Sequence, residues 1–297
     1  MTSTDQAGRL GIIGGSGLYR MAALENARWQ AVETPWGAPS DELLVGTING
    51  REVVFLPRHG RNHGLAPNEL NHRANIAAMK ALGVNEILSL SACGSFREHL
   101  PPGAFVIIDQ YIDRTQGRTR SFFGDGVVAH VSMAEPLCGR LGDITAEACE
   151  ALGILRQKGG TYVCIEGPQF STRAESLLYR SWGADVIGMT NLPEAYLARE
   201  AEICYQSVAM VTDFDCWHED HAAVEVSDVV RVLGENSRLA QQLVVEVASR
   251  LPLRSAPCAS GCDRALEHAV LTPASAWPED AKARLASIAG RIMGVSE

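Results

Sequence analysis

Short apolar runs alternate with longer helical patterns along most of this chain, and this alternation limits the possible folds more than any other feature. The apolar runs have the length of strands, and the segments between them carry apolar residues at the spacing of an amphipathic helix. Strands that alternate with helices are typical of an α/β sheet with parallel or mixed strands. We expect strands at residues 10–13, 43–48, 53–56, 86–91, 104–109, 161–165, 184–189 and 204–211.

The expected helices begin or end at residues that commonly mark helix boundaries. Gly83 and Gly183 each follow a helical pattern, at the place where a C-terminal glycine is favoured. Ser171 is a candidate N-cap, and Asn49-Gly50 predicts a tight hairpin turn between two strands. The predicted helices cover residues 68–82, 171–182, 193–201, 226–250 and 281–293, together with one that starts at 143 or 145 and ends near 152.

The sequence predicts one domain followed by a tail. Its 297 residues contain no internal repeat, low-complexity tract or linker that would divide them. A hydrophobic content of 46% with 21% charged residues fits a globular protein with a substantial core. We therefore expect an α/β fold, a single domain with a central mixed β-sheet flanked by helices over residues 9–252. Residues 253–297 then form a C-terminal tail with a helix.

Charge and cysteine content narrow the classes of partner. A net charge of −9 argues against a nucleic-acid binder or a membrane-surface protein. No run approaches the ~18 apolar residues of a membrane span, and no secretory signal is visible. Eight cysteines in a chain of this size indicate reduced thiols in the cytoplasm. Cys258 and Cys262 lack a second pair or matching histidines, so we expect no metal site.

Two carboxylates, Asp213 and Asp215, come directly after the apolar run 204–211. In an open α/β sheet, ligands bind just beyond the carboxyl ends of the strands. Acids at that position can accept a hydrogen bond from an amino group, protonate a leaving group or hold a metal. The same residues would also serve as a solvated turn or a helix cap. This segment alone leaves both interpretations open.

Small hydroxyl residues follow three other predicted strands. Ser16 lies in the glycine-rich loop 11–17, which matches neither the dinucleotide fingerprint nor a P-loop. On its own, such a loop is more often a tight turn than a binding site. Ser91 and Thr190 each follow a later strand, where either one would be a routine turn residue. Together they supply the kind of neutral donors that a buried oxyanion requires.

A basic segment follows the strand at 53–56. It contains Arg58, His59, Arg61 and His63 within residues 57–63. Such a cluster suits capture of a phosphate or carboxylate through a bidentate arginine, and the alternative is a solvated basic turn. A metal is disfavoured here, because the arginines would repel a cation.

Several motifs stand in the order of the trimeric purine nucleoside phosphorylase family, which the chain resembles over about residues 9–250. These motifs are residues 11–17, 58–61, 92–95, 166–175 and 188–194, while 108–115 and 212–217 are similar to the 5′-methylthioadenosine phosphorylase branch. The resemblance implies a nucleoside phosphorylase-like fold and a homotrimer. It also implies phosphorolysis of 5′-methylthioadenosine to adenine and 5-methylthioribose-1-phosphate, in purine and methionine salvage. An apolar pocket for the methylthio group would also fit 5′-deoxyadenosine, which we expect as a further substrate.

The resemblance also implies a role for each matching residue. Phosphate would be held by Ser16, Arg58, His59, Ser91, Thr190 and the backbone of Ala92. The nucleoside would be contacted by Met189 under the ribose, Phe170 beside the base, Val226 and Val229 at the methylthio group, and His130 from a neighbouring subunit. Ser16 and Ser91 stand where threonine is common in the family, and the hydroxyl is retained. No metal or organic cofactor is implied, because inorganic phosphate is itself the nucleophile.

In the reaction that the resemblance implies, Asp213 and Asp215 would each have a chemical role. A departing purine needs a proton at N7, which a buried carboxylic acid such as Asp213 can supply. The 6-amino group of adenine is a donor, so a carboxylate at Asp215 or Asp213 would accept from it, whereas a 6-oxo group would be repelled. An Asn at position 213 would instead favour the oxo base. A 6-oxo-nucleoside phosphorylase and a non-catalytic purine-binding protein are the competing hypotheses.

Overall fold

A computed structural model of the chain describes residues 8–15, 17–218, 226–254 and 256–293. The described strands join in a single 11-stranded sheet with the order β2-β3-β4-β1-β5-β10-β9-β7, to which β11 is added beside β5, β6 beside β11 and β8 beside β6. The strands are β1 (Arg9–Gly14), β2 (Glu25–Gln30), β3 (Leu43–Ile48), β4 (Arg51–Pro57), β5 (Val84–Ser95), β6 (Phe105–Ile107), β7 (Gln110–Arg114), β8 (Arg156–Lys158), β9 (Thr161–Ile165), β10 (Val186–Gly188) and β11 (Cys204–Asp213).

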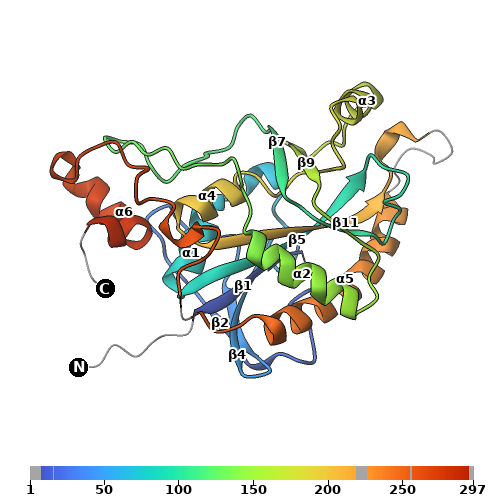
Figure 1. Cartoon of the computed structure of the whole chain (residues 1–297), viewed down its shortest axis with the longest axis horizontal. Coiled ribbons are helices and arrows are strands. Elements are labelled where there is room, and N and C mark those ends of the chain that lie inside the picture. Colours follow the sequence, from blue (N-terminus) through green and yellow to red (C-terminus); the bar gives the residue numbers. More distant parts are fainter. Residues whose placement is uncertain (1–7, 16, 219–225, 255, 294–297) are drawn as a thin grey trace.

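Helices cover both faces of this sheet, as Figure 1 shows. They are α1 (His72–Ala81), α2 (Gly139–Ala151), α3 (Arg173–Ser181), α4 (Glu194–Glu200), α5 (Val226–Arg250) and α6 (Glu279–Met293). Alternate residues of a strand point to opposite faces, so Ile12 joins the apolar cluster under α2 and α5, whereas Ile13 joins the cluster under α1, α4 and α6. The predicted mixed sheet flanked by helices is therefore confirmed.

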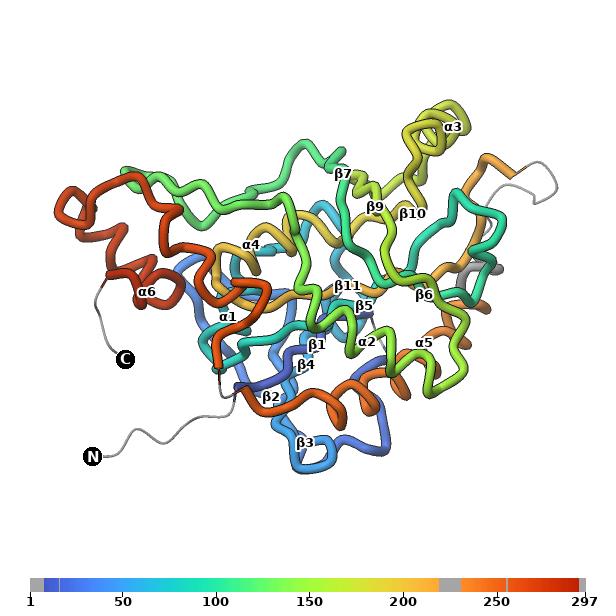
Figure 2. Tube along the Cα trace, viewed as in Figure 1, coloured from blue at the N-terminus to red at the C-terminus, as the bar shows by residue number. Residues whose placement is uncertain are grey.

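Strand β5 is the centre of the sheet. It runs parallel to β1 and β11, and near its carboxyl end it pairs in antiparallel fashion with β10, where Ile187 faces Gly94. Strand β10 in turn lies parallel to β9, which brings the 161–188 region against the end of β5 (Figure 2). As a result, the chain that leaves β10 travels back alongside β5.

Three helix starts differ from the predictions, and in α1 and α3 the side chain of another residue caps the helix. Helix α1 begins at His72, since the Asn71 side chain accepts from the Ala74 N–H at 3.1 Å. Helix α2 begins at Gly139, so residues 143 and 145, the expected start, lie inside it; the Thr145 hydroxyl donates to the Leu141 carbonyl. Helix α3 is capped by Thr172 rather than by Ser171, and Glu175 completes a capping box.

The hairpin and the remaining predicted elements are present with small shifts of their ends. Asn49 and Gly50 have φ values of 50° and 79°, as a type I′ turn between β3 and β4 requires. The sequence did not predict β2, β7 or β8. These strands lack an alternating apolar pattern, and most of their residues are exposed or half-buried.

The segment that follows α5 packs against the main body of the protein. Leu266, Trp277 and Leu285 belong to the same apolar cluster as α1 and α4. The Leu271 N–H donates to the Val128 carbonyl and the His130 N–H to the Ala269 carbonyl, so this segment also pairs with residues 128–130.

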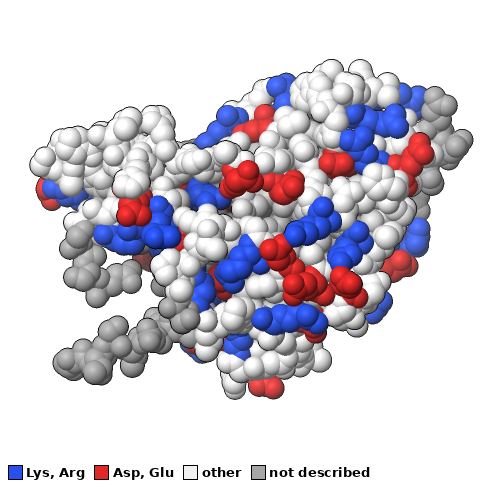
Figure 3. Space-filling view, viewed as in Figure 1, with Lys and Arg blue, Asp and Glu red and all other residues white. Residues whose placement is uncertain are grey.

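The surface charge and the helix composition both bear on the kind of partner the protein can have. On the face shown in Figure 3, acidic and basic side chains are interspersed rather than gathered into a patch of one sign. Among the described residues, no helix combines the length and the apolar character needed to cross a bilayer.

Candidate active site

A cavity of about 640 Å³ lies where β1, β4, β5, β9, β10 and β11 end or continue into loops. Segments far apart in the sequence therefore contribute side chains to one site. Its lining includes most of the predicted site residues, namely Arg58, His59, Ser91, Ala92, Phe170, Met189, Thr190, Asp213 and Asp215.

The other predicted site residues are not placed in the cavity. Ser16 lies outside the described residues, although Gly15 beside it lines the cavity. Val226 and Val229 start α5, but their side chains are outside the described part; the helix reaches the cavity through Leu233 and Ser237. His130 is exposed, on the segment that pairs with residues 269–271.

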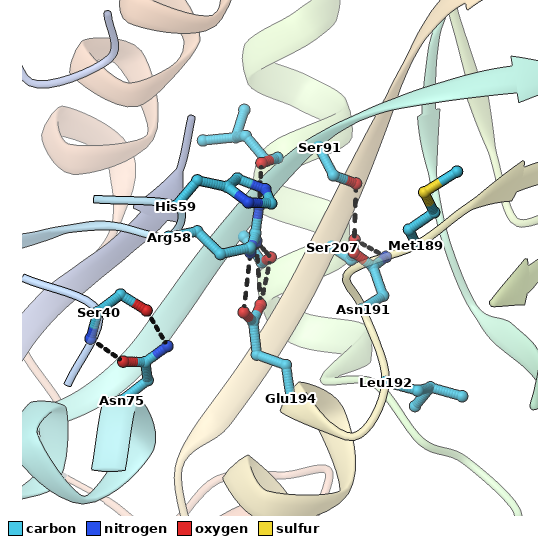
Figure 4. A network of polar contacts seen from close by, with 12 residues as sticks. Ser40, Arg58, His59, Asn75, Ser91, Met189, Asn191, Leu192, Glu194 and Ser207 are labelled. Atoms are coloured by element: carbon cyan, nitrogen blue, oxygen red, sulfur yellow. Dashed lines mark hydrogen bonds and ion pairs between the residues drawn. The ribbon is translucent and has the colours of Figure 1, made fainter. Parts of the chain in front are cut away.

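Arg58 follows β4 and is almost completely buried. Its guanidinium forms two hydrogen bonds to the Glu194 carboxylate, of 3.0 and 3.1 Å, and others to the Leu90 carbonyl and the Ser89 hydroxyl (Figure 4). Burial opposes the charge on Arg58, but the paired Glu194 nevertheless holds its pKa above the ordinary value. The bidentate face that we expected to hold phosphate is therefore occupied by Glu194, and one Nη1–H is left for a ligand.

Glu194 is the partner that sequence reasoning missed. It lies at the start of α4, is fully buried, and accepts further hydrogen bonds from the Ser89 and Tyr205 hydroxyls at 2.6 and 2.7 Å. Burial favours the neutral acid, but Arg58 keeps the pKa of Glu194 below its ordinary value. The sequence feature that could have identified Glu194 is its place in the 188–194 motif, which also contains the predicted phosphate ligand Thr190.

His59 enters the cavity as a neutral imidazole. Burial, together with the charge of Arg58, lowers the pKa of His59 to about 4. Its Nδ1 lies 2.8 Å from the Leu65 carbonyl oxygen, which can only accept, so Nδ1 carries the proton. Nε2 is then an acceptor at neutral pH. Arg61, by contrast, pairs with Asp41 and Glu42 and stacks over Trp29, so it is a structural residue.

Ser91 and Thr190 come together from β5 and from the loop after β10. The Ser91 hydroxyl lies 3.2 Å from Asn191 Oδ1, and Asn191 is fixed in turn by the Ser207 hydroxyl at 2.5 Å (Figure 4). Thr190 Oγ1 is buried and has no hydrogen-bond partner among the described residues. A buried hydroxyl that lines a cavity without a partner indicates a ligand position, because leaving such a group unpaired is costly.

The antiparallel pairing of β10 with β5 sets the order of residues along the cavity wall. At one end Ile187 faces Gly94, and at the other end Asn191 contacts Ser91. Met189 lies between the two ends. Because a strand rises about 3.3 Å per residue, Ser91 and Gly94 are about 10 Å apart. This separation leaves room for a pentose between an anion at Ser91 and a base at Gly94.

The two carboxylates occupy the Gly94 end. Asp213 Oδ1 accepts from the Asp215 N–H at 2.8 Å, so Asp213 forms a local turn and lines the cavity as well. The Thr212 hydroxyl lies 2.7 Å from Asp213 Oδ2 and 3.1 Å from the Cys93 carbonyl oxygen. A hydroxyl has a single proton and a carbonyl only accepts, so both contacts are complete when Asp213 Oδ2 is protonated. Burial raises the pKa of Asp213, in agreement with that state.

Asp215 is held by the residue that was expected to cap α3. The Ser171 hydroxyl lies 3.0 Å from both oxygens of Asp215, and burial raises the pKa of this carboxyl group too. Phe170, next to Ser171, is 55% exposed and lies at the edge of the cavity. An aromatic ring beside two acids suits recognition of a flat base that carries donor groups.

Gly94 allows these acids to approach β5. A Cβ atom at this position would lie 3.0 Å from Asp213 Oδ1 and 3.2 Å from the Asp215 Cβ. Both contacts are tighter than ordinary van der Waals packing, so a side chain here would displace the carboxyl groups.

Arg118 is a second residue that sequence reasoning missed. Its guanidinium donates to the carbonyls of Met189 and Leu192 at 2.7 and 2.6 Å, and to the carbonyl of Glu166 at 2.6 Å. It therefore ties the loop after β9 to the loop after β10. The Glu166 carboxylate belongs to the same contact, since it pairs with Arg118 at 3.4 Å. No sequence pattern relates Arg118 to these loops.

Comparison with known proteins gives a consistent result. The family model of the Phosphorylase superfamily matches residues 9–249. The S-methyl-5′-thioadenosine phosphorylase of Rhodospirillum rubrum is 56% identical over 285 residues, which cover 96% of this chain and 97% of that protein. The protein of the same name from Cereibacter sphaeroides is 55% identical over 284 residues, covering 96% and 98% of the two chains.

Solved structures agree with these relatives. A methylthioadenosine phosphorylase sourced from an antarctic soil metagenomic library matches with a TM-score of 0.90 at 49% identity, over 96% of this chain and 99% of that chain. Methylthioadenosine phosphorylase from Schistosoma mansoni in complex with adenine matches with a TM-score of 0.78 at 37% identity, over 81% and 91% of the two chains. The chain therefore belongs to the phosphorylase superfamily and, within it, to the methylthioadenosine phosphorylases.

Proposed function

We propose that this protein catalyses the phosphorolysis of 5′-methylthioadenosine to adenine and 5-methylthioribose-1-phosphate. One observation carries the proposal: a single cavity has the hydroxyl groups of Ser91 and Thr190 at one place and, about 10 Å away along β5, two carboxyl groups, of which Asp215 is buried and Asp213 half-buried. Phosphate at the first end can attack the anomeric carbon of a ribose in the middle. The base then departs toward the carboxyl groups.

Asp213 is the proton donor for the departing base. Burial raises the pKa of Asp213, which favours the protonated acid, and the Thr212 hydroxyl lies 2.7 Å from Asp213 Oδ2. As the glycosidic bond breaks, negative charge collects on the purine, and transfer of the proton to N7 neutralises it. Asp215 accepts a hydrogen bond from the 6-amino group, while Ser171 fixes the orientation of its carboxylate. This pairing favours adenine over a 6-oxo purine, which offers an acceptor at that position.

The phosphate end is close to neutral, because Glu194 balances the charge of Arg58. Thr190, the free Nη1–H of Arg58 and the backbone of Ala92 supply donors to the phosphate oxygens. The Ser91 hydroxyl joins them by turning away from Asn191 Oδ1, to which it donates at 3.2 Å. His59 Nε2 accepts, so it suits the P–OH group of a monohydrogen phosphate. Ser16 adds a hydroxyl donor from the loop after β1. Inorganic phosphate is thus the co-substrate, and the proposed reaction uses no metal or organic cofactor.

The sugar end is apolar where it is described. Met189 and Leu233 line the cavity, and we assign Val226 and Val229 of the same helix as Leu233 to the methylthio group. An apolar wall favours a thioether over a hydroxyl by about 0.8 kcal/mol for each buried methylene-sized group. The wall also accepts 5′-deoxyadenosine, which lacks the 5′-hydroxyl as well.

The protein acts in the cytoplasm as a homotrimer in which His130 reaches the 5′ side of a neighbouring site. The exposed apolar side chains of Leu177 and Leu178 on α3, with Trp182 after it, support contact between subunits next to the cavity. Light scattering coupled to size-exclusion chromatography tests the trimer. A monomer that retains full activity would contradict both the trimer and the role of His130.

The decisive experiment follows the release of adenine. Purified protein should liberate adenine from methylthioadenosine when phosphate is supplied and should leave the substrate intact in phosphate-free buffer. Parallel assays with 5′-deoxyadenosine, adenosine and methylthioinosine give the order of kcat/KM values. Release of adenine without phosphate, or a higher kcat/KM for methylthioinosine, would contradict the proposed reaction or the proposed base.

A further inference from the structure

Four cysteines that are distant in the sequence converge on one point outside the cavity. Cys138 is the N-cap of α2, Cys204 is the first residue of β11, and Cys258 and Cys262 belong to the segment after α5. All four side chains are buried. Their sulfur atoms all lie within 4.8 Å of one another.

The distances between these sulfurs suit a shared metal ion better than disulfides. The Cys138 and Cys258 sulfurs are 3.7 Å apart, whereas a disulfide bond is about 2.0 Å long. Zinc–thiolate bonds of about 2.3 Å in a tetrahedron place the sulfurs about 3.8 Å apart. Four sulfurs that are all mutually close also define one tetrahedron rather than two separate pairs.

The groups around the cluster suit negative charge. The Arg254 guanidinium lies 3.5 Å from the Cys204 sulfur and pairs with Asp263, whose carboxylate also accepts from the Cys258 N–H at 3.0 Å. Cys138 lies at the start of α2, where the helix dipole favours a thiolate. A tetrathiolate metal site carries a net charge of −2, and a guanidinium that donates to one of its sulfurs stabilises that charge.

We propose that Cys138, Cys204, Cys258 and Cys262 form a structural Zn²⁺ site. Binding releases the four thiol protons, and the four thiolates fill the coordination shell. A closed shell leaves no position for water or substrate, so the ion stabilises the fold and takes no part in the reaction. The sequence argument against zinc counted only Cys258 and Cys262, because nothing in the spacing relates them to Cys138 and Cys204.

The site would fasten the segment after α5 to the main body at two points, the start of α2 and the start of β11. Beyond Cys262, this segment continues to Ala269, which accepts from the His130 N–H at 2.8 Å. Zinc would therefore also stabilise the conformation of the segment that carries His130.

The test uses the full-length protein, produced with zinc in the medium and purified with a reductant. Mass spectrometry of metals should find about one zinc ion per chain. After removal of zinc, Co²⁺ should bind with the sulfur-to-cobalt charge-transfer bands of a tetrahedral thiolate site. Cys258→Ser and Cys262→Ser should lose the zinc and those bands. Cys149→Ser, which alters a buried cysteine of α2 outside the cluster, should retain both.

Two results would overturn the proposal. One is the absence of zinc and of thiolate–cobalt bands from the reduced wild-type protein, a measurement that does not depend on how well any variant folds. The other is a thiol count below eight in a second preparation, purified without reductant under exclusion of air and then denatured with chelator, since all 8 cysteines stay unoxidised in a zinc site. A lowered count would assign the cluster to disulfides. A melting temperature that falls on chelation in the wild type and in Cys149→Ser, but not in Cys262→Ser, would support the structural role.

Discussion

Glu194 binds Arg58 through both carboxylate oxygens, at 3.0 and 3.1 Å, with both side chains shielded from solvent. This arginine of the cavity therefore has its charge balanced inside the protein. In the proposed reaction, phosphate would meet a set of positioned dipoles rather than an unpaired cation. The hydroxyl groups and the one free N–H of Arg58 would then account for most of its recognition.

Replacing Glu194 with glutamine should leave Arg58 as an uncompensated buried charge. We expect the free energy of unfolding to fall by about 3–5 kcal/mol in phosphate-free buffer. Phosphate should restore part of this loss, because the anion takes the place of the missing carboxylate. Thermal melts with and without phosphate measure this, with Glu42→Gln, a half-buried partner of Arg61 outside the cavity lining, as the control. A phosphate-induced shift equal to that of the wild type would contradict the expectation.

Thr190→Val should weaken phosphate binding without weakening the fold. The hydroxyl has no partner among the described residues, so its loss should leave the melting temperature nearly unchanged. A hydrogen bond to an anion contributes about 1.5 kcal/mol or more, which raises the KM for phosphate about tenfold or more. Thr145→Val is the matched control, because the Thr145 hydroxyl is bonded to Leu141 inside α2. That control should lose stability and keep its KM.

Asp213→Asn should remove the proton donor and alter the choice of base. We expect kcat/KM for methylthioadenosine to fall by about 10²–10⁴-fold, with a rise in the ratio of methylthioinosine to methylthioadenosine use. Burial raises the pKa of Asp213, and the protonated form is the active one, so wild-type kcat/KM should decline as the pH rises through that pKa. The variant should lack this decline. Asp143→Asn, at an exposed residue of α2, is the control.

Gly94→Ala tests the close approach of the two acids to β5. The added methyl group would press on Asp213 Oδ1 and on Asp215, at a cost of about 1–3 kcal/mol in stability. The kcat/KM should also fall under conditions in which the variant is still fully folded, since both acids shift from their proposed positions beside the base. Gly234→Ala, in an open position of α5, should keep its kcat/KM and gain about 0.5–1 kcal/mol. Equal kcat/KM in both variants would contradict the assignment.

Glu200 should make the fold less stable as the pH rises toward neutrality. Burial raises the pKa of Glu200 from 4.5 to about 7, so between these values the folded state holds a proton that the unfolded state has lost. The stabilisation is complete below the unfolded pKa and is lost as the pH passes through 7, a difference on the order of 3 kcal/mol. Glu200→Gln should flatten this slope in urea titrations at pH 5 and pH 8. The exposed Glu147→Gln should retain it.

The sequence predicted the parts of the fold that depend on local patterns. Apolar runs located β9 and β11, and Asn49-Gly50 identified a hairpin whose two positive φ values the structure confirms. The edge strands β2 and β8 were missed, because half-exposed strands carry no alternating apolar pattern. The resemblance to the phosphorylase family was confirmed by relatives at 55–56% identity.

In the site, too, some residues were predictable from local patterns and others were not. That Ser91 and Asp213 line one cavity was predictable, because strand ends converge at one edge of the sheet, while their roles stay predictions. The partners that position them were not, since Glu194 reaches Arg58 across 136 residues and Ser171 reaches Asp215 across 44. Such pairings depend on how helices and loops pack, and spacing along the chain holds no trace of them.

Arg118 has a further consequence for substrate binding. Because it holds the carbonyls of Glu166, Met189 and Leu192 together, the wall of the cavity to which we assign the ribose and the base is assembled before any ligand arrives. Ordering this wall then takes no free energy from the encounter with the nucleoside, and binding can be tight without a large entropic penalty. Preorganisation of this kind also means that a nucleoside of another shape meets a rigid surface rather than one that adapts.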